Sequence, residues 1–532
     1  NPEQAACNDS CNYTDIFVTK MNPTGTGLLY STFIGGSNGD QGTAIAVDSA
    51  GNVVVAGITW SFDFPLKNAV TVVLSSYANH GFALSLTPSG SKLNFSTYLG
   101  GVGSDAATGI DVDSAGQVYV AGYTGSSNFP ITPGHQIGPP PGNYSNDIFL
   151  AQFGRLGKLF YSTLIGGNSN GYPGTFGTGP VSVKVNSGHE AILAGAAFAG
   201  FPTTPGSFQP DYPAYGGSSG FIARLNANGT NFVASSYLGG STYDAISQID
   251  LDSTGNIYAT GTAQSLDFPT TPGAFQTTNI QGSQVAFVTK IDPALSGLIY
   301  STYFGGTQSS YGNGVSATAI AVDVSGNAVI AGNTSQPDLP LFSPLQSQPP
   351  QSPYYGYSTS AFLSILNATG SALEFSTYFS GSTSTTAQGV ALDASGNPYL
   401  TGTTFDTDLP TTAGAFQTSP PPSTNNPQHA FVTKFLLSTP NAAVCLSTGT
   451  IFLRSVGGKP SRSESLSITN CGTADLLITS LAVGNPSFTA TSSGCTRILP
   501  GANCIVKVKY SPAPDSDFDN STLKLVDNAP IP

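Results

Sequence analysis

The sequence predicts an all-β protein whose larger part is a β-propeller. A phrase of the type YSTYFGG (300–306) occurs six times, with starts 65 to 75 residues apart. A strand–turn–strand phrase of the type AIAVDSAGNVVVAG (44–57) follows most copies, and we find no helical periodicity anywhere. A four-stranded unit repeated in this way is the pattern of one propeller blade.

The strand–turn–strand phrase predicts a β-hairpin. β-Branched residues alternate on both sides of an Asp-x-x-Gly-Asn turn. Asp48 and Asp323 can accept hydrogen bonds from their own turn amides, and the glycine supplies the positive φ that closes the turn. Five copies are regular, and a degenerate copy stands at 181–195.

A third strand of the type AFVTK (286–290) occurs seven times and completes the repeat. We expect the hairpin strands to be innermost (A) and next (B), the AFVTK strand third (C), and the YSTYFGG strand outermost (D). The chain then runs C–D, five complete A–B–C–D blades, and A–B–C.

Ring closure follows from this strand order. We expect six blades, with the D strand at 28–33 completing the last blade beside the hairpin at 389–402, which removes an open edge. One C strand is left over, at 15–20 or at 430–435. It lies at the blade edge, links to the next domain, or pairs with another chain.

The repeated phrases, including DFPTTPGAFQ (267–276), resemble the bacterial SBBP-type β-propeller repeat over about residues 15–435. The resemblance implies a secreted or cell-surface protein. Proteins of this type are described as seven-bladed, so seven blades are the alternative to the six that the hairpin count predicts.

Residues 439–532 form a second predicted domain of short alternating strands. The run SLSITNCGTADLLITSLAV (465–483) resembles Ig-like domains of the ASH or choice-of-anchor D type. That resemblance implies a β-sandwich, here expected to lack its last strand. It also suggests a hairpin disulfide between Cys495 and Cys504, and a second one between Cys445 and Cys471.

The remaining two cysteines lie in a polar segment, 1–14, that precedes the predicted propeller (15–438). Cys7 and Cys11 are four residues apart, which predicts a small disulfide loop. An even number of cysteines placed outside the repeats indicates an oxidising compartment.

Composition limits the possible partners. Only 8% of residues are charged and the net charge is −13. Phosphate binding needs clustered Lys and Arg, so nucleic acid is not expected as a partner. No stretch of 18 apolar residues predicts a membrane-spanning helix.

No catalytic constellation is visible, and we therefore expect a protein that is not an enzyme. The Gly-x-Ser-x-Gly match at 216–220 lies in a Tyr/Pro/Gly loop, whereas a nucleophile elbow joins a strand to a helix. Glu190 and Glu374 stand at unrelated positions of the repeat, unlike the paired carboxylates of glycosidases.

Two kinds of residue remain as weak site candidates. Asp40, Asp105 and Asp244 follow the D strands and could offer oxygens to Ca²⁺ at the channel mouth, although no calcium-loop motif is present. No other cofactor is expected. Tyrosines of the long loops could contact sugars or protein, or pack locally with proline: Tyr144, Tyr212, Tyr215, Tyr354, Tyr355 and Tyr357.

Together these features favour an extracellular structural or adhesive protein of a bacterial surface. It would assemble with copies of itself, as a fibre or layer, or join other surface proteins or glycans. Strand addition or domain docking would supply the contact. The alternative is a carbohydrate- or protein-binding propeller that uses the face carrying the long Pro/Tyr-rich loops.

Overall fold

A computed structural model of the chain shows two compact units, residues 1–435 and 436–532, which are treated separately below. It describes residues 3–7, 13–71, 78–138, 147–166, 180–279, 284–307, 314–352, 356–420, 428–437, 444–447, 451–453, 460–461, 463–470, 475–492, 495–499, 502–512 and 520–527. Every element in these ranges is a β-strand. No helix that could cross a membrane occurs among the described residues.

Five sheets of the larger unit share one pattern, in which four antiparallel strands pair in chain order. Their strands are β3 (Asp40–Val47), β4 (Val53–Thr59), β5 (His80–Leu86) and β6 (Leu93–Leu99); β7 (Asp105–Val112), β8 (Val118–Thr124), β10 (Asp147–Phe153) and β11 (Leu159–Ile165); β12 (Ser182–Val185), β13 (Ala191–Ala197), β14 (Ser219–Leu225) and β15 (Phe232–Leu238); β16 (Asp244–Leu251), β17 (Ile257–Ala263), β18 (Val285–Ile291) and β19 (Leu298–Phe304); and β20 (Val315–Val322), β21 (Ala328–Thr334), β24 (Ser360–Leu366) and β25 (Leu373–Phe379).

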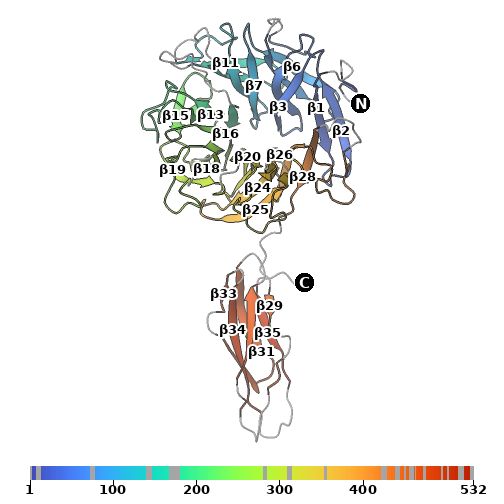
Figure 1. The fold of residues 1–532 in the computed structure, drawn as a ribbon, viewed down its shortest axis with the longest axis vertical. Helices are drawn as coiled ribbons and strands as arrows, with labels where there is room; N and C mark the ends of the chain where they lie inside the picture. The colour runs from blue at the N-terminus through green and yellow to red at the C-terminus, as the bar shows by residue number, and fades with distance from the viewer. Residues whose placement is uncertain are drawn as a thin grey trace. The chain divides into compact units, whose positions relative to one another are not determined.

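The sheets are arranged around a common centre, as in a propeller (Figure 1). Strands such as β16 and β20 lie toward the centre and β15, β19 and β25 toward the outside, which agrees with the predicted A–B–C–D order. The short β9 (Gln136–Ile137) adds in parallel to β11, and β22 (Gln351–Ser352) pairs with β23 (Gly356–Tyr357).

The predicted A–B turn is confirmed. Asp48 Oδ1 accepts hydrogen bonds from Ala50 N and Asn52 N at 2.9 and 2.8 Å. Gly51 has a φ of 83°, in the left-handed region that glycine enters without a steric cost. The turn therefore forms from its own side chains, so each A–B hairpin is specified locally.

Apolar clusters hold neighbouring sheets together. One cluster joins Tyr258 and Val288 of β17 and β18 to Ile320 and Ile330 of β20 and β21 in the next sheet. Burying an aliphatic or aromatic side chain of this size stabilises a fold by about 1.5–3 kcal/mol. Neighbouring four-stranded sheets thus stabilise each other.

Two further sheets of this unit are incomplete, and they correct the predicted ring closure. β26 (Thr385–Leu392), β27 (Pro398–Thr404) and β28 (His429–Lys434) form an A–B–C sheet, while β1 (Ile16–Met21) pairs with β2 (Leu28–Ile34) as a C–D hairpin. Among the described strands, β2 pairs only with β1, so it does not complete the last blade. The expected closure is wrong because C and D strands joined by a short turn pair locally, as they do in the five four-stranded sheets.

In the part of the smaller unit that the structure describes, the strands form two sheets. β29 (Val444–Leu446), β30 (Glu464–Asn470), β34 (Asn503–Tyr510) and β32 (Phe488–Ser492) form one, and β33 (Arg497–Ile498), β31 (Leu476–Val483) and β35 (Leu523–Asp527) form the other. β34 alternates strictly between exposed and buried residues, as a strand with one solvated face does. Its buried residues join an apolar cluster that includes Ile468 and Leu476.

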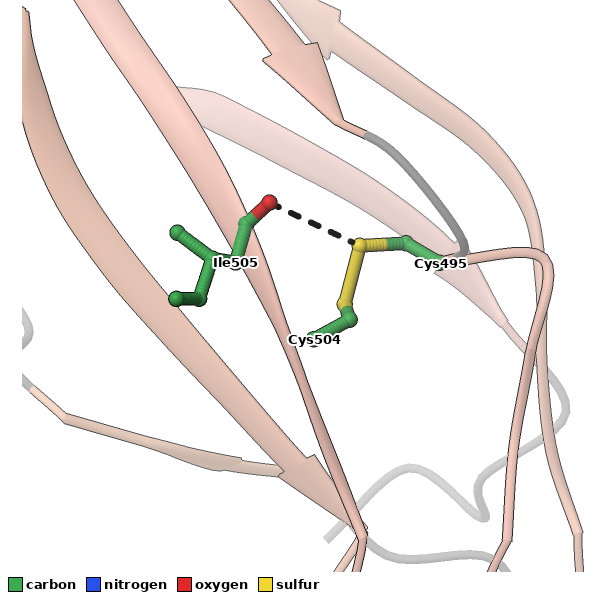
Figure 2. Close-up of a disulfide and its surroundings, with 3 residues drawn as sticks. All are labelled: Cys495, Cys504 and Ile505. Atoms are coloured by element: carbon green, nitrogen blue, oxygen red, sulfur yellow. Dashed lines mark hydrogen bonds between the residues drawn. A yellow bond between two sulfur atoms is a disulfide. The ribbon is translucent and has the colours of Figure 1, made fainter.

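The predicted disulfide between Cys495 and Cys504 is present, with a Cα–Cα distance of 5.4 Å. It joins the start of β34 to the segment before β33, and the Cys495 sulfur lies 3.9 Å from the Ile505 carbonyl oxygen (Figure 2). Cys7 is also disulfide-bonded. Cys11 and Cys471 lie outside the described residues, and the side chain of Cys445 is not described.

Candidate functional site

The calcium candidates are buried structural carboxylates. Asp40, Asp105 and Asp244 are at most 1% exposed and stand at the start of three different A strands. Each accepts a hydrogen bond from the glycine four residues earlier, for example Gly240 N to Asp244 Oδ2 at 2.7 Å. Burial raises the pKa of Asp40 and of Asp244. The described residues contain no cluster of three or more His, Cys, Asp or Glu side chains suited to a metal ion.

The tyrosine candidates are not gathered into one surface by the described residues. The ring of Tyr212 packs edge-on against Tyr237 and its hydroxyl donates to the Gly217 carbonyl, as the local-packing alternative expects. Tyr215 is 98% exposed. Tyr357 lies in β23, but its side chain is not described. The other three candidates lie outside the described residues: Tyr144, Tyr354 and Tyr355.

A different site emerges where the incomplete sheets meet the first four-stranded sheet. We name it the open region and define it by four exposed apolar side chains: Phe17 of β1, Ile45 and Val47 of β3, and Val432 of β28. Comparison with the other repeats shows why their exposure is unusual.

Phe17 occupies the phenylalanine position of the C strand. It is 56% exposed, whereas the same position is 0% exposed in all five four-stranded sheets. In those sheets, the ring belongs to an apolar cluster shared with the preceding sheet, as Phe287 shares one with Ile222 and Leu238. It is also covered by its own B strand, because a Cβ at Gly57 would meet the ring of Phe82 at 2.6 Å.

Ile45 and Val432 show the same loss of cover from opposite sides. Ile45 is 61% exposed, but the equivalent Ile320 is 3% exposed and packs on Tyr258 of the preceding sheet. Val432 is 46% exposed, but the equivalent Val288 is fully buried against the following sheet. Both therefore face the space between the β26–β28 sheet and the β3–β6 sheet.

Sheet edges add backbone hydrogen-bonding groups to this region. In the described residues, β28 pairs with β27 alone and β1 pairs with β2 alone, so each strand keeps one edge without a neighbouring strand. Exposed edges of this kind accept further strands. The open region combines apolar faces with unpaired edges, which is the chemistry of a strand-binding site.

Sequence reasoning did not single out these four residues. Strand counting showed that the repeats do not fill whole blades, but it placed the imbalance in one spare strand. The useful signal was the position of each residue in the repeat: each is apolar at a position that packs against an apolar cluster in the other repeats.

Comparison with known proteins supports the repeat. A family model described as "Beta-propeller repeat" (SBBP) matches residues 94–130. No curated protein matches the chain.

Several solved structures resemble the chain with TM-scores below 0.4. A protein of unknown function from Bacteroides caccae is 9% identical, with 69% of this chain and 90% of that chain covered and a TM-score of 0.33. The polysaccharide lyase Uly1 is 8% identical, with 89% and 90% covered and a TM-score of 0.33. An endo-arabinase from Bacteroides thetaiotaomicron is 12% identical, with 62% and 93% covered and a TM-score of 0.27.

These neighbours correct the expectation that the protein is not an enzyme. They include polysaccharide lyases, an endo-arabinase and a gluconolactonase from Xanthomonas campestris. Structures of this general kind therefore include enzymes, and the absence of a familiar motif does not exclude catalysis. Likenesses at these TM-scores carry no activity or substrate over to this chain.

Proposed function

We propose that the protein is an extracellular structural protein that associates with other polypeptides, first of all copies of itself, by strand addition at the open region. The observation that carries the proposal is the exposure of Phe17 in β1. The phenylalanine at this position of the C strand is fully buried in all five four-stranded sheets. Exposed apolar faces beside unpaired strand edges favour association.

Composition and disulfides support the same proposal. Only 8% of residues are charged, so few charges lose their hydration when two copies meet. The Cys495–Cys504 disulfide is compatible with an oxidising, extracellular compartment. We also propose that the smaller unit is an Ig-like domain that takes part in assembly.

The test compares the association state of the full chain with that of two variants. Ile45→Glu combined with Val432→Glu places charges on both walls of the open region, and both side chains are exposed, so folding should be kept. Val324→Glu is the matched control, because Val324 is fully exposed in the turn between β20 and β21. Light scattering and electron microscopy should show concentration-dependent oligomers for the wild type and the control, and fewer for the double variant. A wild-type chain that stays monomeric without fibres would refute self-assembly.

A second candidate function is glycan binding through the loop between β13 and β14. The 98% exposure of Tyr215 favours it, since a free aromatic face can stack on a sugar. Binding on a glycan array that is lost in Tyr215→Ala would support this candidate, and no binding to any glycan would count against it.

A further inference from the structure

The β1–β2 hairpin has defined neighbours on both sides. On the side of the β26–β28 sheet, Phe416 N donates to Gly25 O in the β1–β2 turn at 2.9 Å. The same contact links successive four-stranded sheets, where Phe275 N donates to Gly370 O at 2.8 Å. The β1–β2 turn therefore occupies the position of a C–D turn in the sheet that would follow β26–β28 around the ring.

The other side of the hairpin repeats a second contact. A Cβ at Gly90, in the β5–β6 turn, would meet the ring of Tyr30 in β2 at 2.3 Å. At Gly370, in the β24–β25 turn, it would meet Tyr300 of β19 at the same distance. β2 thus lies against the C–D turn of the β3–β6 sheet, as the D strand β19 lies against the C–D turn of the next sheet, β20–β25.

The residues before β1 follow the repeat as well. Phe33 N donates to Gln4 O at 3.1 Å, as Tyr303 N donates to Gln276 O at 2.9 Å. Gln276 lies within the connection from the B strand β17 to the C strand β18, so Gln4 holds the equivalent place before β1. The hairpin is therefore the outer half, strands C and D, of a sheet that lies between β26–β28 and β3–β6.

The exposed residues identify which strands would complete this interface. Val432 lacks the A and B strands that cover Val288, and Ile45 lacks the B strand that covers Ile320. Phe17 lacks a B strand in its own sheet. It also lacks a D strand paired with β28, which would correspond to β15, the D strand whose Leu238 shares an apolar cluster with Phe287. The three strands D, A and B are consecutive in the order of the repeat.

We infer that the open region is an acceptor for one three-stranded segment of this chain's own repeat type, in the order D–A–B. Its D strand pairs with the edge of β28, and its B strand with the edge of β1, that no strand in the described part of the chain occupies. Its A strand packs on Ile45 and Val47 of β3. The inference rests on the proposed strand addition and names what is added.

The test uses the full chain and a peptide with the sequence of residues 232–272, which carries strands β15, β16 and β17 and the loop after them. Titration calorimetry should show saturable one-to-one binding. Hydrogen exchange should slow in β28, β1 and β3. The Ile45→Glu, Val432→Glu double variant should weaken binding at least about tenfold, because it places charges in an apolar contact. The Val324→Glu control should leave binding unchanged.

A fusion keeps the inference falsifiable if the peptide alone aggregates. A second copy of residues 232–272, fused to the N-terminus of the chain, should raise the melting temperature and protect β28, relative to a scrambled segment of the same composition. No protection in either format, or binding that the double variant does not weaken, would overturn the inference.

The same peptide separates this inference from the proposed function. Oligomers that persist when the peptide is present in excess would overturn the D–A–B assignment and leave self-assembly standing. Peptide binding to a chain that is monomeric at every concentration would support the assignment and refute self-assembly.

Discussion

Two tyrosines of β19 provide a test of how buried hydrogen bonds hold the connection between β17 and β18 on its own sheet. Tyr303 is fully buried, and its hydroxyl donates to Ser265 O at 2.7 Å and accepts from Phe268 N at 3.0 Å. Tyr300 is 3% exposed, and within the described part of the chain its hydroxyl has no hydrogen-bond partner. Tyr303→Phe and Tyr300→Phe therefore remove the same atom from one strand with different consequences.

The difference in stability follows from the hydrogen bonds. Tyr303→Phe leaves a carbonyl and an amide unpaired in the core, which should lower the free energy of unfolding by about 2–3 kcal/mol. Tyr300→Phe removes a polar group that is buried without compensation, so stability should stay the same or rise by up to about 1 kcal/mol. The two variants should thus differ by about 3 kcal/mol.

Urea unfolding measured by tryptophan fluorescence gives the required comparison. Trp60 is the single tryptophan of the chain, so its emission follows the larger unit alone. Tyr303→Phe should shift the midpoint to lower urea with the slope unchanged. Equal losses in the two variants would refute the reasoning, because the volume removed, and not the hydrogen bonds, would then decide the cost.

Three further outcomes are expected. Burial raises the pKa of Asp147 to about 7, so the free energy of unfolding should fall as pH rises from about 4, the pKa in the unfolded chain, toward 7. Asp147→Asn should remove this pH dependence and add about 2–4 kcal/mol at pH 8 but almost nothing at pH 4. An unchanged pH profile of unfolding in the variant would contradict this expectation. Replacing Cys495 and Cys504 together by serine opens a loop with a sequence separation of 9, which should cost about 2.5 kcal/mol in the smaller unit and leave the Trp60 transition unchanged. Asp244→Ala should destabilise the larger unit by about 3 kcal/mol, since Gly240 N and Ser265 Oγ lose their acceptor, and calorimetry that shows no loss would refute its structural role.

Much of the repeat could be predicted because its information is local. The Asp48 turn contains its own hydrogen-bond acceptor and its own glycine, and short turns join the A strand to the B strand and the C strand to the D strand. The loop disulfide between Cys495 and Cys504 was equally accessible, since its two cysteines bracket a short hairpin. Each of these features depends on contacts within a few residues or within one repeat.

Ring closure and the site could not be predicted in the same way, because they depend on contacts between repeats far apart in sequence. The sequences of β1 and β18 differ little, and only the surroundings make Phe17 exposed and Phe287 buried. The surroundings of the weak calcium candidates were hidden for a related reason: the sequence places Asp40 after a D strand but does not show that its carboxylate accepts a hydrogen bond from the Gly36 amide.

Energetics decide which strands can occupy the open region. Its four apolar side chains are already about half buried, so covering the rest contributes about 3–7 kcal/mol. Ordering a segment of about forty residues costs several tens of kcal/mol in backbone entropy, so an arbitrary peptide has too little to gain there. A D–A–B segment of this repeat brings further burial of its own, as Ile249 and Leu238 do in the sheets that contain them. Selectivity at the open region should therefore come from the apolar residues of the incoming strands, and replacing Ile249 and Leu238 of the peptide by serine should abolish its binding although the acceptor is unchanged.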